Sequence, residues 1–177
     1  MTRTLLKLLA ALAAVFALSG PALAAAPEPT ARVDLGRMMG RWYEVARFPN
    51  KTQRGCQAGT VDWTRSADGF SVLQTCRKGS LTAPKTEWKA KARVVDAATN
   101  AKFKMSFFGG LVSQEYWVID NRPDQGWLLL GTPGGNYLWL MAQHPLLNPQ
   151  AKATALSRIR QLGYDVGRLE FPLPARD

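Results

Sequence analysis

Apolar and charged residues alternate more cleanly in one stretch of this chain than anywhere else in it. The alternating residues are Trp88, Lys89, Ala90, Lys91, Ala92, Arg93 and Val94. A two-residue period is that of a β-strand with one buried and one solvated face. The small alanines leave space that a close-packed core would have to fill from elsewhere, so this strand also fits the wall of a cavity.

Turn residues separate this stretch from seven others of similar length. The predicted strands cover residues 41–48, 59–65, 70–77, 88–94, 102–108, 115–121, 127–131 and 137–143. Asn148 and Pro149 then begin a predicted helix over residues 149–162, and a short last strand is expected at about 167–171. This order predicts an all-β fold, an eight-stranded antiparallel up-and-down β-barrel with one C-terminal α-helix packed outside. Closing the barrel removes both sheet edges, and eight strands leave room for one small ligand.

The first predicted strand follows Gly40 and carries a charge on its apolar face. Trp42, Ala46 and Phe48 share that face with Glu44. The pattern allows two interpretations, a core strand anchored by its tryptophan or the wall of a ligand cavity. Just before it, residues 34–39 predict a short helical turn capped by its first residue, an aspartate. Its leucine and methionines, Leu35 with Met38 or Met39, are expected to plug one end of the barrel.

The first 24 residues have the pattern of a secretory signal peptide. Arg3 and Lys7 precede an apolar run, and small residues follow it, which predicts cleavage after Ala24 or Ala26. A retained membrane anchor is the alternative. Residues 25–33 are expected to be a loose lead-in, residues 34–172 the barrel domain with its late helix, and residues 173–177 a tail. Because no cysteine lies near the cleavage region to accept a lipid, the prediction is a soluble periplasmic or secreted protein.

Cys56 and Cys76 are the two cysteines of the chain. One precedes the second predicted strand and the other ends the third, so a hairpin with an Asp-Gly turn at residues 68–69 brings them to the same end. In an exported protein this favours a disulfide, worth about 3 kcal/mol in the chain-entropy description. A reactive thiol is the alternative.

The basic excess is dispersed along the chain. Removing residues 1–24 takes away two cations and lowers the formal charge from +10 to +8. Single cations between apolar residues fit the solvated face of strands, or attraction to an anionic membrane surface. The export signal and the lack of a basic tail argue against nucleic acid as a partner.

The residues that enzymes use are scarce. The single histidine, His144, precedes a proline in the turn before the predicted helix, and it fits a structural role better than a haem or metal ligand. Hydrolase, zinc-protease and phosphate-loop motifs are absent from the sequence. No catalytic residue, metal or cofactor is predicted.

Four segments resemble the lipocalin family, in its bacterial and apolipoprotein D branch. Residues 40–48 match the first family signature, residues 106–109 and 116–120 fall at the family spacing, and residues 137–141 with His144-Pro145 resemble a later strand of that branch. Two departures stand out. Gln143 occupies the position where the family usually has an arginine packed over Trp42, and residues 120–124 keep only part of the second motif. Gly40, Trp42 and Gln143 are therefore assigned structural roles.

The resemblance implies a carrier of a small hydrophobic ligand, with fatty acids or lysophospholipids as the class. The expected cavity residues are Ala46, Phe48, Val61, Trp63, Val72, Trp88, Ala90, Phe107, Trp117 and Trp139, for each of which ordinary core packing is the alternative. Lys51, Arg54 and Lys78 are candidates to bind an anionic headgroup at the rim, although surface charge also explains them. An envelope-surface protein that binds anionic lipid through its basic charge is the second function considered, and a lipocalin-fold enzyme the third.

Overall fold

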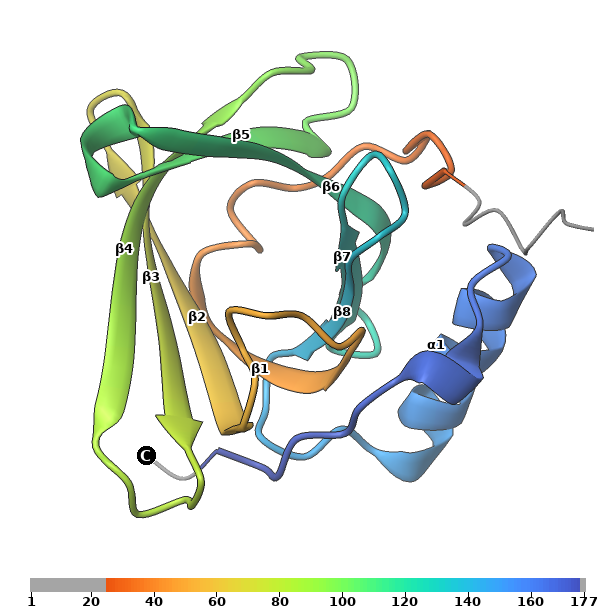
Figure 1. The fold of residues 1–177 in the computed structure, drawn as a ribbon. Coiled ribbons are helices and arrows are strands. Elements are labelled where there is room, and N and C mark those ends of the chain that lie inside the picture. Colours follow the sequence, from red (N-terminus) through yellow and green to blue (C-terminus); the bar gives the residue numbers. More distant parts are fainter. Residues whose placement is uncertain (1–24, 176–177) are drawn as a thin grey trace, which may run out of the picture.

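Eight antiparallel strands form one closed barrel in chain order (Figure 1), which confirms the predicted fold class. The computed structural model describes residues 25–175, so the predicted signal peptide lies outside the described residues. The strands are β1 (Gly40–Arg47), β2 (Cys56–Ser66), β3 (Gly69–Lys78), β4 (Lys85–Val94), β5 (Lys102–Phe107), β6 (Val112–Arg122), β7 (Trp127–Gly131) and β8 (Leu138–Ala142). The last strand pairs with the first, so the barrel has no free edge.

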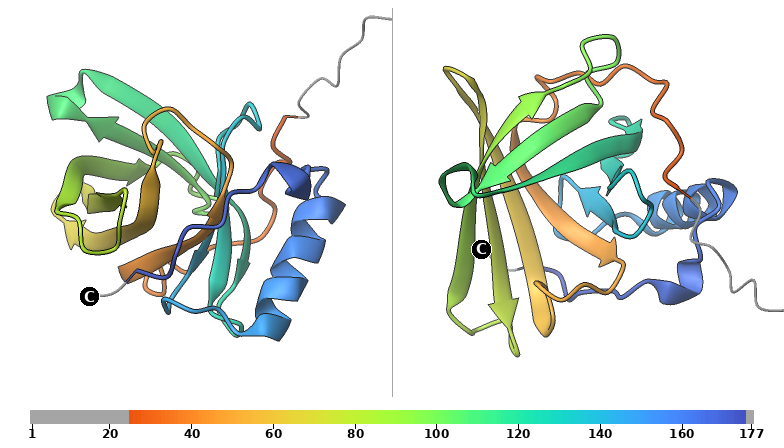
Figure 2. Two further views of the ribbon diagram at one scale, coloured as in Figure 1. Left: turned by 60° about the horizontal axis from the view of Figure 1, so that its bottom comes forward. Right: turned by 45° about the horizontal axis from the view of Figure 1, so that its top comes forward.

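One helix, α1 (Pro149–Gln161), packs on the outside of the barrel (Figures 1 and 2), as predicted. The Asn148 side chain caps it by accepting a hydrogen bond from the Gln150 N–H at 2.8 Å, and Pro149 occupies the first helical position. Ala151, Ala155 and Ile159 are its buried residues, one per turn.

The outer helix is also held to β6 by a charged contact. Arg158 Nε lies 2.5 Å from Asp120 Oδ2, at the reduced second family motif. Asp120 is largely buried, so this contact is stronger than an exposed ion pair. The residual motif thus serves to position the helix.

The segment that precedes the barrel, residues 25–33, is held to it by hydrogen bonds and an ion pair. In the expected lead-in, the Ala26 N–H donates to the Pro133 carbonyl at 3.0 Å and the Val33 N–H to the Thr99 carbonyl at 2.7 Å. Glu28 Oε2 lies 2.5 Å from Lys102 Nζ. The segment has no helix or strand, but these contacts hold it, and the expectation of a loose lead-in is corrected accordingly.

The predicted last strand at 167–171 is absent from the described chain. A single turn of 3-10 helix, η2 (Val166–Arg168), occupies its start, and one isolated bridge joins Glu170 to Arg47 of β1. Pro172 and Pro174 have no N–H to donate, which stops a strand ladder from extending past this bridge.

The interior of the barrel is filled at one end. A turn at residues 35–38 precedes β1, and its Asp34 side chain accepts from the Gly36 N–H at 2.7 Å. Met38 is buried against Trp42, whose indole Nε1 donates to the Met38 carbonyl at 3.0 Å. The predicted turn and plug are confirmed, and this end is the closed end of the barrel.

Trp42 is buried in the inner cluster, and its surroundings differ from the family pattern. Among the described residues, no arginine or lysine lies over its ring in a cation–π contact. Gln143 is partly buried at the same end, where its N–H donates to the Gly126 carbonyl at 3.0 Å. The backbone of residue 143 is thus joined to the β6–β7 turn, and the Met38 carbonyl binds the indole.

A register shift in β1 changes which side its residues face. The pairing of β1 with β8 shifts between Glu44 and Ala46, so Val45 is an extra residue, as in a β-bulge. Trp42 packs inside the barrel, whereas Ala46 and Phe48 pack in the outer cluster beneath α1. A slip of one residue turns every later side chain to the other face.

The disulfide between Cys56 and Cys76 is present, with the two Cα atoms 5.7 Å apart. The hairpin between β2 and β3 brings them together as predicted, since the partner of Cys76 in the ladder is Gly59, near the start of β2. Both thiols are used by this bond, and neither is free to react.

Candidate ligand cavity

A cavity of about 420 Å³ occupies the interior of the barrel away from the Met38 plug. Every strand contributes to its wall, because residues on alternate positions of all eight strands face inward. The loop after β1 and the loop between β5 and β6 also line it. This end is called the mouth below.

Four of the ten predicted cavity residues line the cavity. They are Val61 on β2, Trp88 on β4, Phe107 on β5 and Trp139 on β8. Three of the four are aromatic, so they supply large apolar faces for a ligand.

Three further predicted residues face inward but lie nearer the closed end than the cavity does. Trp63, Val72 and Ala90 belong to the packed cluster that fills the closed end. Val72 pairs with Ala90 across β3 and β4, two residues closer to the closed end than the pair of Gln74 and Trp88, which does line the cavity. Their direction was predicted correctly, but they are part of the core.

Ala46, Phe48 and Trp117 lie outside the barrel, and their assignment to the cavity was wrong. The bulge turns the first two outward, and the Phe48 ring lies 4.4 Å beneath the Arg168 guanidinium. Trp117 packs in the outer cluster, with Lys102 Nζ 4.5 Å from its ring centre. Its neighbour Tyr116 lines the cavity instead. Because β6 is apolar on both faces, its sequence does not distinguish the inner residue from the outer one.

Several lining residues were not predicted. The apolar ones are Phe108, Val112, Tyr116, Leu130, Tyr137 and Met141. Met141 follows Trp139 by two positions on β8, so extending the alternation of that strand would have found it. Phe108 and Tyr137 lie in turns, where alternation gives no signal.

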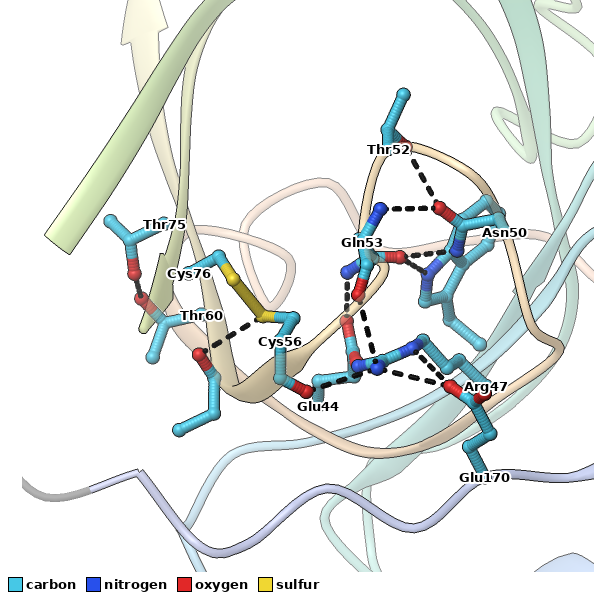
Figure 3. The surroundings of a disulfide bond; sticks show 12 residues. Glu44, Arg47, Asn50, Thr52, Gln53, Cys56, Thr60, Thr75, Cys76 and Glu170 are labelled. Atoms are coloured by element: carbon cyan, nitrogen blue, oxygen red, sulfur yellow. Dashed lines mark hydrogen bonds and ion pairs between the residues drawn. A yellow bond between two sulfur atoms is a disulfide. The ribbon is translucent and has the colours of Figure 1, made fainter. Parts of the chain in front are cut away.

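A polar network forms one side of the cavity (Figure 3). Gln53, from the loop after β1, donates from Nε2 to Glu44 Oε2 at 2.5 Å. Its Oε1 accepts from the Trp139 indole at 2.9 Å and from Asn50 Nδ2 at 2.6 Å. Gly59 makes room for the carboxylate, since a Cβ there would lie 3.0 Å from Glu44 Oε2. The loop is thereby bound to the interior wall.

Glu44 is also paired with a buried cation. Arg47 forms an ion pair with Glu44 Oε1, lies 3.1 Å from Glu170 Oε2, and donates to the Cys56 carbonyl at 3.0 Å. The network therefore connects β1, the C-terminal segment and the disulfide (Figure 3). Burial raises the pKa of the Glu44 carboxyl above its ordinary value, against the opposing effect of Arg47.

Over residues 25–175, the cavity wall has no cation to bind an anionic headgroup. Among the lining residues of the described chain, Glu44 is the single carboxylate, and none is a lysine or arginine. Burial raises the pKa of Tyr116 to about 12, so its phenol is neutral and able to donate at physiological pH. The predicted rim cations Lys51, Arg54 and Lys78 are exposed and do not line the cavity, although the first two flank the lining residues 52 and 53.

Metal and membrane-spanning features were also sought in residues 25–175. No three metal-binding side chains of the His, Cys, Asp or Glu type come together there. None of the helices in that range has the length and apolar character needed to cross a bilayer. His144 is exposed just after β8, at the closed end.

Comparison with known proteins agrees with this architecture. Residues 33–174 match the family model of the lipocalin-like domain. The outer membrane lipoprotein Blc of Vibrio cholerae is 29% identical over 149 residues, covering 81% of this chain and 84% of the relative. Blc of Escherichia coli strain K12 is 30% identical over 138 residues, covering 76% of each chain. Insecticyanin of the tobacco hornworm Manduca sexta has the same fold, with a TM-score of 0.68, 15% identity, and coverage of 83% of this chain and 85% of its own.

Proposed function

Because this chain belongs to the lipocalin family, we propose that it binds and carries a small hydrophobic ligand in its barrel cavity. One observation carries the proposal: a cavity of about 420 Å³, sealed at one end by Met38 and Trp42, has a wall made mostly of apolar side chains. A packed core would leave no such volume. Cavities of this size are typical of small-molecule sites.

The proposed ligand is a single-chain amphiphile, a fatty acid or a lysophospholipid. Each methylene of an acyl chain gains about 0.8 kcal/mol on leaving water, so aromatic walls alone support tight binding. A carboxylate or phosphate deep in the cavity would be buried without a cation, because no lysine or arginine is among the described lining residues. We therefore propose that the acyl chain enters first and that the headgroup stays at the mouth near Lys51 and Arg54.

We propose that the protein acts in the cell envelope after export, in lipid storage, transport or maintenance. The signal pattern of residues 1–24 and the disulfide support an oxidising compartment. The two Blc relatives are named as lipoproteins, whereas Cys56 and Cys76 of this chain are bonded to each other. The proposal is accordingly a soluble protein of the periplasm or exterior.

We propose a binding function without catalysis. The two thiols are not available as nucleophiles, and His144 lies at the end of the barrel opposite the cavity mouth. A nucleophile with a base in hydrogen-bond reach is the usual requirement of covalent catalysis.

The experiment starts from the full-length gene. The recovered exported protein is weighed by mass spectrometry, delipidated, and titrated with a fluorescent fatty acid and with a lysophospholipid. We expect a chain beginning at residue 25 or 27, and saturable one-to-one binding that changes tryptophan emission. A protein that binds neither ligand would contradict the carrier function.

A pair of tryptophan variants locates the ligand. Trp88→Phe removes an indole of the cavity wall, and Trp117→Phe removes one from the outer face. The emission change on binding should shrink in Trp88→Phe and persist in Trp117→Phe. The reverse result would place the ligand outside the barrel.

A further inference from the structure

Large apolar side chains are exposed in and beside two connections at the mouth of the cavity, the β5–β6 connection and the β7–β8 connection. Phe108, Leu111, Val112 and Tyr137 are 65%, 88%, 52% and 39% exposed. Three of them line the cavity, and Leu111 lies between Phe108 and Val112 in the β5–β6 connection. We call these four residues the mouth patch. An apolar group at the entrance of a site marks a surface for interaction.

The loops at the two ends of the barrel differ in charge. The mouth loops, residues 48–55, 79–84, 108–111 and 132–137, contain two cations, Lys51 and Arg54, and no acidic residue. The three hairpin loops at the closed end, residues 67–68, 95–101 and 123–126, each contain one aspartate and no cation. The ends of the strands carry cations at both ends of the barrel, so the difference lies in the loops.

We propose that the mouth docks onto a lipid bilayer that contains anionic phospholipid. The mouth patch enters the interfacial layer, where aromatic and aliphatic side chains leave water, and Lys51 and Arg54 meet the headgroup charge. This goes beyond the carrier function, because it assigns a surface and a partner outside the cavity. In this orientation the cavity opens onto the membrane, so an acyl chain passes between the two without crossing water.

The charge of the mouth distinguishes the bilayer from a second copy of the chain. Two mouths facing each other would bring Lys51 and Arg54 of both copies together, and like charges repel. An anionic bilayer supplies the opposite charge. Electrostatics therefore favour the membrane as the occupant of this surface.

Vesicle sedimentation tests the charge requirement. The delipidated exported protein is mixed with vesicles of phosphatidylcholine alone or with added phosphatidylglycerol. We expect binding to the anionic vesicles that weakens as salt is raised. Lys51→Glu with Arg54→Glu should weaken it by more than about fivefold per site, the contribution of one cation near such a surface.

The control for this variant has the same net charge. Lys91→Glu with Lys104→Glu changes two exposed cations on the outer wall, on β4 and β5. It should weaken vesicle binding much less. An equal effect of the two pairs would mean that net charge, not the mouth, attracts the bilayer, and would overturn the proposal.

A second pair of variants tests the mouth patch. Leu111→Ser removes its most exposed side chain, and Leu146→Ser removes a leucine that is 74% exposed at the closed end. Burial of one leucine predicts about a tenfold loss of vesicle binding in the first variant and none in the second. Equal binding by both would overturn docking through the mouth.

Two further measurements distinguish membrane docking from ligand binding in the cavity and from dimerisation through the mouth. Leu111 does not line the cavity, so Leu111→Ser should still bind soluble fatty acid, whatever the vesicle result. Size-exclusion chromatography detects the other occupant. Concentration-dependent dimerisation that Leu111→Ser abolishes, without vesicle binding by the original protein, would overturn the proposal in favour of a second copy.

Discussion

Glu44 places a negative charge in the wall of an otherwise mostly apolar cavity. Both of its oxygens are occupied, one by Arg47 and the other by Gln53. Arg47 in turn contacts the half-exposed Glu170 and the Cys56 carbonyl. Burying an ion pair gives little net stability, because desolvation offsets the attraction between the charges. Here Glu44 positions the loop over the cavity.

The buried Glu44 predicts how stability changes with pH. Its pKa is raised above 4.5 in the folded protein by burial, so folding binds a proton. That contribution is complete below pH 4.5 and is lost as pH rises through the folded-state pKa. The free energy of unfolding of the natural protein should therefore fall, relative to that of Glu44→Gln, as pH rises through this window.

Urea titrations of both proteins between about pH 4 and pH 8 measure this difference. Glu87→Gln, on the exposed outer face of β4, controls for the loss of one carboxylate. The prediction would be contradicted if, as pH rises, the free energy of unfolding of the natural protein increased relative to that of Glu44→Gln.

The register of single residues limits what the sequence reveals about the site. Val61, Trp88 and Phe107 line the cavity as predicted, and each lies in a stretch where apolar residues alternate with polar or charged ones. Ala46 was misplaced because a bulge leaves no mark in the sequence of β1. Its position is set by pairing with β8, nearly a hundred residues later in the chain.

At the scale of the element, β1 serves two packing environments. Before the bulge Trp42 packs within the barrel, and after it Phe48 packs under the outer helix. A strand with strict alternation would leave one of these clusters without its aromatic ring. The bulge therefore allows one strand of eight residues to join the barrel core to the helix.

Two glycines, one at the start of β3 and one just after its end, supply a prediction about a close contact. Gly69 has φ +133°, and a Cβ added there would lie 2.4 Å from the Ala92 carbonyl oxygen on β4. Gly79 has φ +80°, with no atom within 4 Å of an added Cβ. Gly79→Ala should lower the free energy of unfolding by about 1 kcal/mol through backbone strain alone. Gly69→Ala should lower it by about 3 kcal/mol, because the β3–β4 pairing must also shift.

Urea denaturation of the two variants checks this prediction. Each carries the same chemical change at a glycine with positive φ, so the difference between them reports the contact with Ala92 together with the greater backbone strain at φ +133°. Equal losses in the two variants would show that the contact is relieved without cost.

The sequence predicted the strands and the helix better than it predicted which inward residues line the cavity and which belong to the core. Strand order, the helix and its Asn148 cap follow from local patterns, which short segments contain in full. The boundary between core and cavity does not, since Val72 and Trp88 both face inward and differ in their depth along the barrel. That depth depends on the packing of several strands at once.

The disulfide should stabilise the whole barrel. It joins residues 20 positions apart and adjoins the Arg47 network through the Cys56 carbonyl. Replacing both cysteines by alanine should lower the free energy of unfolding by about 3 kcal/mol. Urea titration of the two proteins measures the loss, and alkylation of the unreduced natural protein should label neither thiol. An unchanged midpoint would contradict a stabilising role.

The division into an inner and an outer cluster has a consequence for how such a chain can diversify. None of the residues that line the cavity belongs to the cluster between the barrel and α1. Substitutions on the inner faces of β4, β5 and β6 can therefore change the cargo while the shell beneath the helix is inherited unaltered. Selection can therefore act on the cavity wall and on the packing beneath the helix through separate sets of positions.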